Sequence, residues 1–245
     1  MAAVSMSDIR ALDLGPELPP RSVALENGAA EGEASAAVVA GSLVAFAPGV
    51  SAQHQRDVLQ SLLLAQLAAN AKAERHKDPA AWFRAYTGVL EQTAWVVESS
   101  TTATRYPPQT STFSAASVVS YGFRSLTPEE LTYVTAAVNA FRSDSGGVSQ
   151  VVFECPSHSG GIGNFQVAFV AEEGGVVGMR ILQVSFNAPQ HVTRLMLEDF
   201  TGTAKFQLAF LAVAQNEEVY AKVRSSISAK VESRFEGSVA LLELP

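Results

Sequence analysis

The stretch NFQVAFVAEEGGVVGMRILQVSFNA, residues 164–188, decides the fold class because two apolar segments flank the short polar turn EEGG at 172–175. Such a pattern is typical of a β-hairpin. In a sheet with one face in solvent, alternate residues of each strand would be polar. Here aromatic and branched aliphatic side chains occupy both sets of alternate positions. The stretch therefore predicts a hairpin within a sheet that is buried on both faces.

Further strands are expected around this hairpin. The longest candidates, from their apolar and β-branched residues, are 148–155, 165–171, 176–187 and 203–214, which we expect to form an antiparallel meander. A first strand is expected within 41–49 and a final one within 238–244. The segment SAASVVSYGF, 114–123, fits a strand or a helix, and we favour a strand.

Helices are predicted from their capping residues and from apolar residues at helical spacing. Ser51 can cap one helix, and Asp78 followed by Pro79 begins a second that continues to about residue 97. Thr127 and Glu130 have the spacing of a capping box and predict a third helix at 127–142. A fourth helix is expected after Asn216.

These elements predict an α+β fold with three layers. We expect a central antiparallel sheet with the helical hairpin 51–97 on one face, and the helices at 127–142 and after 216 on the other. Residues 1–38 contain six acidic residues, two arginines and few large side chains, which is typical of a flexible leader. The single domain is then expected to span 39–245.

Composition excludes some classes of function. The net charge of −7 argues against a nucleic-acid partner, because phosphate binding needs a basic surface. The histidines His54, His76, His158 and His191 include no pair at helical ligand spacing, and a lone cysteine excludes a cysteine-rich zinc site, so no metal is expected. The first 20 residues lack the pattern of a signal peptide. We therefore expect a protein that is cytoplasmic as synthesised and stays inside the cell until something else releases it.

The segment ECPSHSGGIG contains the chain's one cysteine, Cys155, close to His158. A thiolate beside an imidazole can act as a nucleophile. The sequence marks no third residue to orient the imidazole, so a structural cysteine is the simpler interpretation. We expect no enzymatic activity, and a thiol hydrolase is the least favoured alternative.

The order of elements, together with the strings LTYVTAAVNAF, NFQVAFVAEEGGVVGMRILQVSFN and KFQLAFLAVAQNEEVYAKV, resembles the Cyt cytolytic delta-endotoxins and the related Erwinia virulence factor family. The resemblance covers roughly residues 40–235. It implies a membrane-active toxin or virulence protein that binds lipid, rearranges its helices away from an apolar sheet and forms pores, with homo-oligomers among its partners. For the virulence-factor branch it also implies a fatty acid held between the layers, with Cys155 as the candidate for acylation.

The residues expected to contact lipid are the large apolar side chains of the central strands. They are Phe165, Val167, Phe169, Ile181, Val184, Phe186, Phe206, Leu208 and Phe210. The alternative is a non-enzymatic protein-interaction or structural module, because a sheet covered on both faces is also the core of any α/β/α protein.

Overall fold

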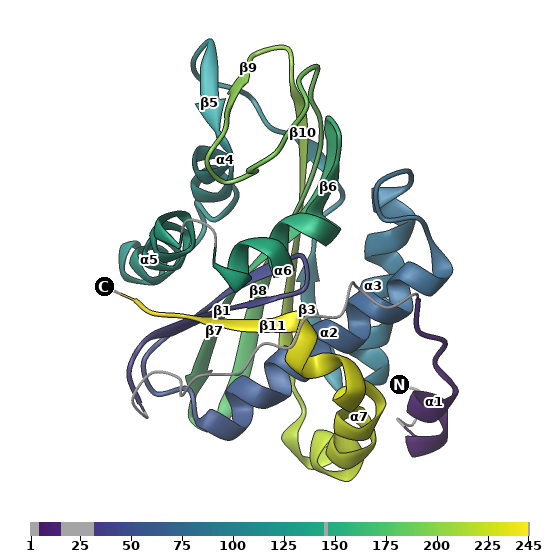
Figure 1. The fold of residues 1–245 in the computed structure, drawn as a ribbon. Helices are drawn as coiled ribbons and strands as arrows, with labels where there is room; N and C mark the ends of the chain where they lie inside the picture. The colour runs from purple at the N-terminus through teal and green to yellow at the C-terminus, as the bar shows by residue number, and fades with distance from the viewer. Residues whose placement is uncertain (1–4, 16–31, 145–146, 245) are drawn as a thin grey trace.

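The hairpin quoted above lies at the centre of a large sheet (Figure 1) in a computed structural model that describes residues 5–15, 32–144 and 147–244. Strands β7 (Ile162–Glu173) and β8 (Val176–Asn187) form it. They are joined at Gly174 and Gly175, whose φ angles of +58° and +80° lie in the left-handed region that glycine adopts without strain. The predicted hairpin is confirmed.

The sheet has the order β11-β1-β2-β7-β8-β10-β3. Its other strands are β10 (Lys205–Gln215), β3 (Trp95–Ser100), β2 (Ser42–Phe46), β1 (Ser35–Val39) and β11 (Val239–Leu242). Two short strands extend it, β4 (Thr104–Arg105) beside β10 and β6 (His158–Ser159) beside β7. A separate ribbon pairs β5 (Thr112–Ser114) with β9 (Asp199–Thr201).

The prediction of a purely antiparallel sheet is wrong at one pair, because β2 runs parallel to β7. More than a hundred residues and five helices, α2 to α6, separate these strands, so no tight turn dictates their relative direction. The remaining pairs of the main sheet are antiparallel.

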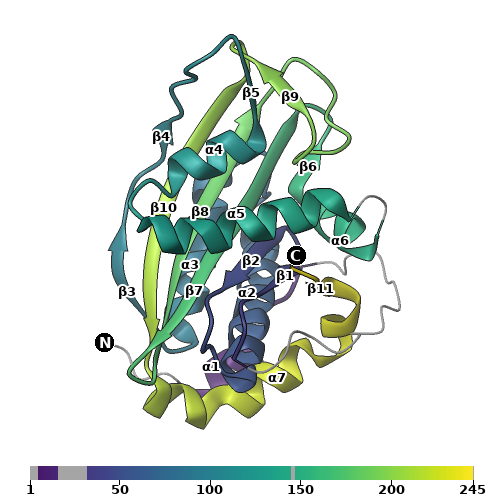
Figure 2. The same ribbon diagram turned by 90° about the vertical axis from the view of Figure 1, so that its left-hand side faces the viewer.

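Helices cover both faces of the sheet, and the predicted three-layer α+β sandwich is confirmed (Figure 2). One layer contains α1 (Met6–Ala11), α2 (Ala52–Lys72), α3 (Pro79–Gln92) and α7 (Glu217–Ser238). The opposite layer contains α4 (Ala115–Gly122), α5 (Pro128–Ser143) and α6 (Val148–Ser157). The predicted caps form at Ser51, at Asp78 and at Asn216, and Thr127 and Glu130 complete the capping box of α5.

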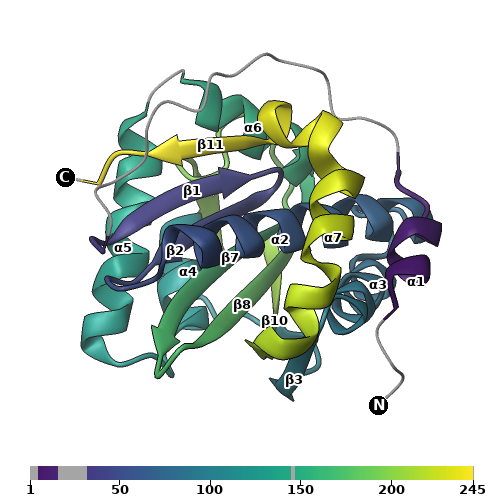
Figure 3. The same cartoon turned by 90° about the horizontal axis from the view of Figure 1, so that it is seen from below.

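The position of α7 corrects the predicted layers. We expected it beside the helix at 127–142, but it packs against α2 on the other face (Figure 3). Its side chains Val223, Ile227 and Val231 are buried in the core that α2 also lines. Asn216 follows β10 directly, and its N–H donates to the carbonyl of Ala94, which directs the helix to the side where α3 ends.

Three local predictions are wrong. The segment 148–155 is helix α6 and not a strand, and most of 114–123 is helix α4, capped by Ser114. Short apolar runs do not distinguish a buried helix from a buried strand, which explains both errors. The second predicted helix ends at Gln92, and Ala94, with φ +66°, leads into strand β3.

The predicted leader is wrong where the structure describes it. Residues 6–11 form α1, in which Ile9 is fully buried, and β1 begins at Ser35 inside the sheet. The predicted boundary between 38 and 39 therefore falls within a strand. Apolar contacts by a few side chains offset the conformational entropy lost when a short segment is ordered. The composition of residues 1–38 did not indicate which side chains would make such contacts. Residues 16–31 lie outside the described part of the chain.

Candidate functional site

The residues predicted to contact lipid gather on one face of the sheet. Seven of them are buried beneath the α4–α6 layer, and Phe210 is half-buried at its border. Ile181 lies on the opposite face, in the core shared with α2 and α7. Figure 2 shows α4 and α5 crossing in front of the strands that carry this apolar face.

Aromatic rings dominate the end of this face near the β5–β9 ribbon. Phe186 and Phe206 stack at 5.1 Å between ring centroids, and Phe200 meets Phe206 edge-to-face at 4.9 Å. Phe113 contacts Phe206 at 5.4 Å. Offset and edge-to-face geometries are those that aromatic quadrupoles favour. The face beneath α4–α6 is thus a packed apolar surface.

Few polar contacts join this layer to the central strands. Within the described residues, the side-chain ion pair that does so links Glu130 of α5 to Arg180 of β8. Burial alone would raise the pKa of Glu130, but hydrogen bonds from the Thr127 backbone and from Arg180 lower it below its ordinary value. Apolar packing therefore provides most of the attachment of α4–α6 to the sheet.

The opposite layer is attached through a buried polar network around Arg75, in the loop between α2 and α3. Its guanidinium donates to the Asn164 carbonyl at 2.9 Å, to Gln66 Oε1 at 2.9 Å and to Gln166 Oε1 at 2.8 Å. It also donates to the Gly41 carbonyl at 3.3 Å and lies 4.5 Å from the centroid of the Trp82 ring. The network joins α2, α3, β7 and the β1–β2 turn.

Arg75 is a buried cation whose hydrogen-bond partners are all neutral oxygens. Burial lowers its pKa to about 9, and the nearby Tyr86 opposes this shift. The guanidinium therefore stays charged at neutral pH. Burial also raises the pKa of Tyr86, which remains a neutral phenol. A charge stabilised only by neutral acceptors depends on the geometry of all of them, so separating this layer from the sheet would leave the guanidinium without its acceptors.

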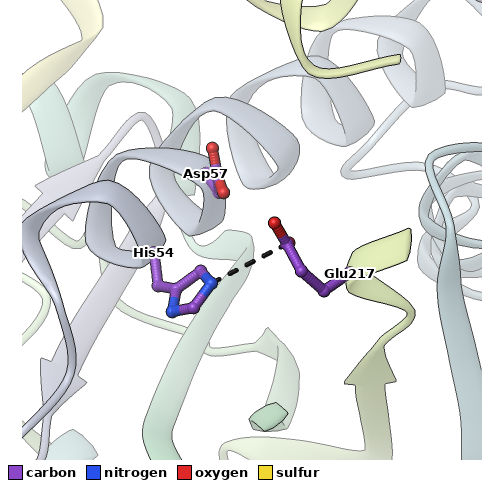
Figure 4. Close-up of side chains that lie close together, drawn as sticks. All are labelled: His54, Asp57 and Glu217. Carbon is purple, nitrogen blue, oxygen red and sulfur yellow. Dashed lines mark ion pairs between the residues drawn. The ribbon is translucent and has the colours of Figure 1, made fainter. Parts of the chain in front are cut away.

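A second polar cluster joins α2, α7 and the end of β7. Arg224 donates to both oxygens of Asp57, at 2.8–3.1 Å, and to both oxygens of Glu217, at 2.7 and 2.9 Å. His54 bonds Glu172 through Nδ1 at 2.8 Å. Its Nε2 lies 3.8 Å from Glu217, and Figure 4 shows these two side chains with Asp57. The hydrogen bonds to Asp57 and Glu217 raise the pKa of Arg224. Burial would raise the pKa of Glu172, but hydrogen bonds from His54 and the Ser51 backbone lower it.

Ligand atoms of His54, Asp57 and Glu217 lie within 4.8 Å of one another, a separation that a metal ion could bridge. A cation there would compete with Arg224, which already donates to every carboxylate oxygen of Asp57 and Glu217. The donor set is therefore better matched to the guanidinium than to a metal. The spacing between pairs of histidines did not predict this cluster, because it contains a single histidine. The signal present in the sequence is that His54 and Asp57 are three residues apart on one helix.

Cys155 is an exposed residue of helix α6. Its predicted position at the end of a strand is wrong. His158 is held by Glu154, with Nε2 2.7 Å from the carboxylate, and the Leu195 N–H also donates to Glu154. An acyl chain on the exposed thiol would begin at the protein surface, whereas Phe153 of the same helix packs inward at 4.9 Å from Phe141. The position of Cys155 does not suit a fatty acid held between the layers.

No family model matches the chain, and no curated protein matches its sequence. No helix in the described ranges is both long and apolar enough to cross a bilayer.

Proposed function

We propose that this protein binds lipid membranes and disrupts them, and that it does so when the α4–α6 layer separates from the sheet. The observation that carries the proposal is the unequal attachment of the two helical layers. The α4–α6 layer, residues 115–157, is one continuous segment held mainly by apolar contact, whereas the opposite layer is joined to the sheet by the Arg75 network.

The physical argument concerns the change of solvent. In water, the hydrophobic effect holds α4–α6 against the sheet. In hydrocarbon this driving force disappears, because lipid tails solvate both apolar surfaces as well as they solvate each other. Buried polar contacts, in contrast, are as costly to break in lipid as in water or more so. Contact with a bilayer should therefore loosen α4–α6 and leave the opposite layer attached.

The strands behind α4–α6 fit lipid contact in length. β7 and β8 each contain 12 residues and β10 contains 11, and a tilted strand needs about 9–11 residues to extend through the hydrocarbon core. The resemblance to the cytolytic toxins and the Erwinia virulence factor family supports a toxin or virulence role on the same grounds. Pore formation and a homo-oligomeric assembly remain part of the proposal.

A reversible disulfide between α4 and β8 tests the separation. A Cβ at Gly122 would lie 3.0 Å from Leu182 Cγ, close to the roughly 3 Å between a Cβ and the far sulfur that disulfide geometry implies. We would combine Gly122→Cys with Leu182→Cys in a Cys155→Ser background. Dye release from phospholipid vesicles should be lost on oxidation and recovered on reduction.

Gly122→Ser with Leu182→Cys, in the same Cys155→Ser background, is the matched control, because it adds a similar side chain at 122, removes the Leu182 methyl groups and cannot form the bridge. Its dye release should not respond to oxidant. Release that persists in the oxidised double variant would contradict separation of this layer. Absence of release from wild-type protein at any lipid composition would contradict membrane activity itself.

A protein-interaction module is the second candidate, and the sheet edges favour it. β3 and β11 are the outer strands, and Val96 of β3 and Leu241 of β11 are about 40% exposed. Unpaired strand edges with apolar side chains can accept a strand from a partner. Capture of a partner without vesicle leakage would favour this function over the first.

A further inference from the structure

A pocket of about 240 Å³ lies where the strands of the sheet extend beyond α5, near the β7–β8 turn. Figure 2 shows the ends of β3, β10, β8 and β7 passing below α5 with no helix in front of them. The pocket is lined by residues of these four strands and by Glu130 of α5. Of the nine residues predicted to contact lipid, Phe169 alone lines this pocket.

The register of three strands creates the hollow. Ala171 of β7 pairs with Gly178 of β8, and Gly178 pairs with Ala214 of β10. Three small residues, one from each strand, therefore form one row across the face. The next row towards α5 contains Phe169 and Arg180, and the next row towards the turn contains Glu173 and Val176. Larger side chains on both sides of a row of small ones leave a cavity with an apolar floor.

The rim of the pocket is acidic. Glu98 of β3, Glu173 of β7 and Glu130 of α5 line it, together with one cation, Arg180. Arg180 is already paired with Glu130. Within the described residues, the carboxylates of Glu98 and Glu173, both on exposed side chains, have no hydrogen bond or ion pair. The pocket thus has two unpaired carboxylates beside apolar surface, including Val176, which is 52% exposed.

We propose that this pocket binds a small organic ammonium ion, with its apolar chain on the Ala171–Gly178–Ala214 row and its charged group at a carboxylate of the rim, that of Glu98 at the β3 end of the row or that of Glu173 at the β7 end. Charge complementarity selects the cation, and the apolar floor selects an alkyl chain over a hydrated metal ion. The volume is below the roughly 300–1,000 Å³ of sites for drug-sized ligands, which suits a chain the length of an amino-acid side chain. This inference does not rest on the proposed membrane activity.

The test uses three probes of equal chain length: hexylammonium, 1-hexanol and hexanoate. Amide chemical shifts of β8, followed by NMR during titration, report occupancy. Hexylammonium should bind in the millimolar range and more weakly as salt is raised, because the partly exposed carboxylates are screened. Hexanol should bind at least fivefold more weakly, and hexanoate should not bind.

Gly178→Val is the decisive variant. A Cβ at Gly178 would meet only the Val213 carbonyl oxygen, at 3.9 Å, so a valine fits the strand while its methyl groups fill the hollow. Hexylammonium binding should fall at least tenfold. Gly88→Ala adds a Cβ on α3, where nothing lies within 4 Å, and should leave binding unchanged.

A second variant tests the charges and does not alter the packing. Glu98→Gln with Glu173→Gln should weaken hexylammonium about tenfold and leave hexanol unchanged. Glu232→Gln, on an exposed position of α7, is the charge control. Equal binding of the three probes, unchanged binding in either pocket variant, or no shifts in β8 would each overturn the proposal. If Gly178→Val failed to fold, the double glutamine variant would decide alone.

Discussion

Replacement of Arg224 by methionine should destabilise the protein strongly, because it leaves the carboxylate of Asp57 buried without its cationic partner. The Asp57 side chain is fully buried, while the Arg224 side chain is 26% exposed. Methionine retains much of the apolar stem of arginine and removes the donors. The remaining donor to the carboxylate in the described structure is Gln53 Nε2, at 2.9 Å.

The expected loss follows from the cost of an unpaired buried charge. Breaking a buried ion pair by removing one partner costs about 3–5 kcal/mol. The hydrogen bond from Gln53 remains in the variant, so we expect a cost at the lower end of this range, about 3 kcal/mol. A chain of this size has a urea m value of roughly 3 kcal/mol per molar, so the unfolding midpoint should fall by about 1 M.

Urea unfolding followed by tryptophan fluorescence measures this loss, since Trp82 and Trp95 are both fully buried. Adding Asp57→Leu to Arg224→Met should restore at least half of the stability, because the uncompensated charge is then gone. Lys222→Met, which removes an exposed ion pair with Glu218 one turn away, should cost less than about 0.5 kcal/mol. A loss below about 1 kcal/mol for Arg224→Met, or a double variant no more stable than the single one, would refute the reasoning.

Three further predictions follow from single side chains. Glu130→Gln should cost about 1 kcal/mol at pH 7. Since the folded-state pKa of Glu130 is lowered from 4.5, the loss should shrink in urea titrations as pH falls below 4.5 and vanish once the carboxyl is protonated in the folded state; a pH-independent loss would contradict it. Cys155→Ser should leave vesicle leakage and melting temperature unchanged, because the thiol is exposed; abolished leakage with unchanged circular dichroism would instead indicate a modified or reactive thiol. Ile9→Ala should lower the free energy of unfolding by about 2–4 kcal/mol in calorimetry, because Ile9 is fully buried. A negligible effect would instead support the prediction that residues 1–38 are a flexible leader.

Much of the fold could be predicted because its determinants are local. The EEGG turn, the capping box of Thr127 and Glu130, and the cap at Ser51 each depend on neighbouring residues, and each forms as expected. The segments 114–123 and 148–155 were misassigned because their apolar residues are too few to define a period. In the structure, Phe153 of α6 packs against Phe165 of β7, a contact that no local pattern contains.

The candidate sites divide in the same way. Apolar residues at both sets of alternate positions predicted that β7, β8 and β10 are buried on both faces. They did not predict that eight of the nine residues named for lipid contact share one face, with Ile181 alone on the other. Arg75 belongs to a polar segment typical of an exposed helix end, and its burial depends on Gln66, Gln166 and Asn164 from other elements. The second cluster was not predicted, and the three-residue spacing of His54 and Asp57 is the sequence feature that could have indicated it.

The three-layer class, the central hairpin and most helix starts could be predicted from local patterns, since periodicity, caps and turn glycines act within a few residues. Tertiary structure decided the side on which α7 packs, the parallel direction of β2, the burial of Arg75 and the alignment of Ala171, Gly178 and Ala214 into a pocket floor. Each of these depends on contacts between residues far apart in the chain. Their free energies arise only when the layers are assembled, so no local pattern encodes them.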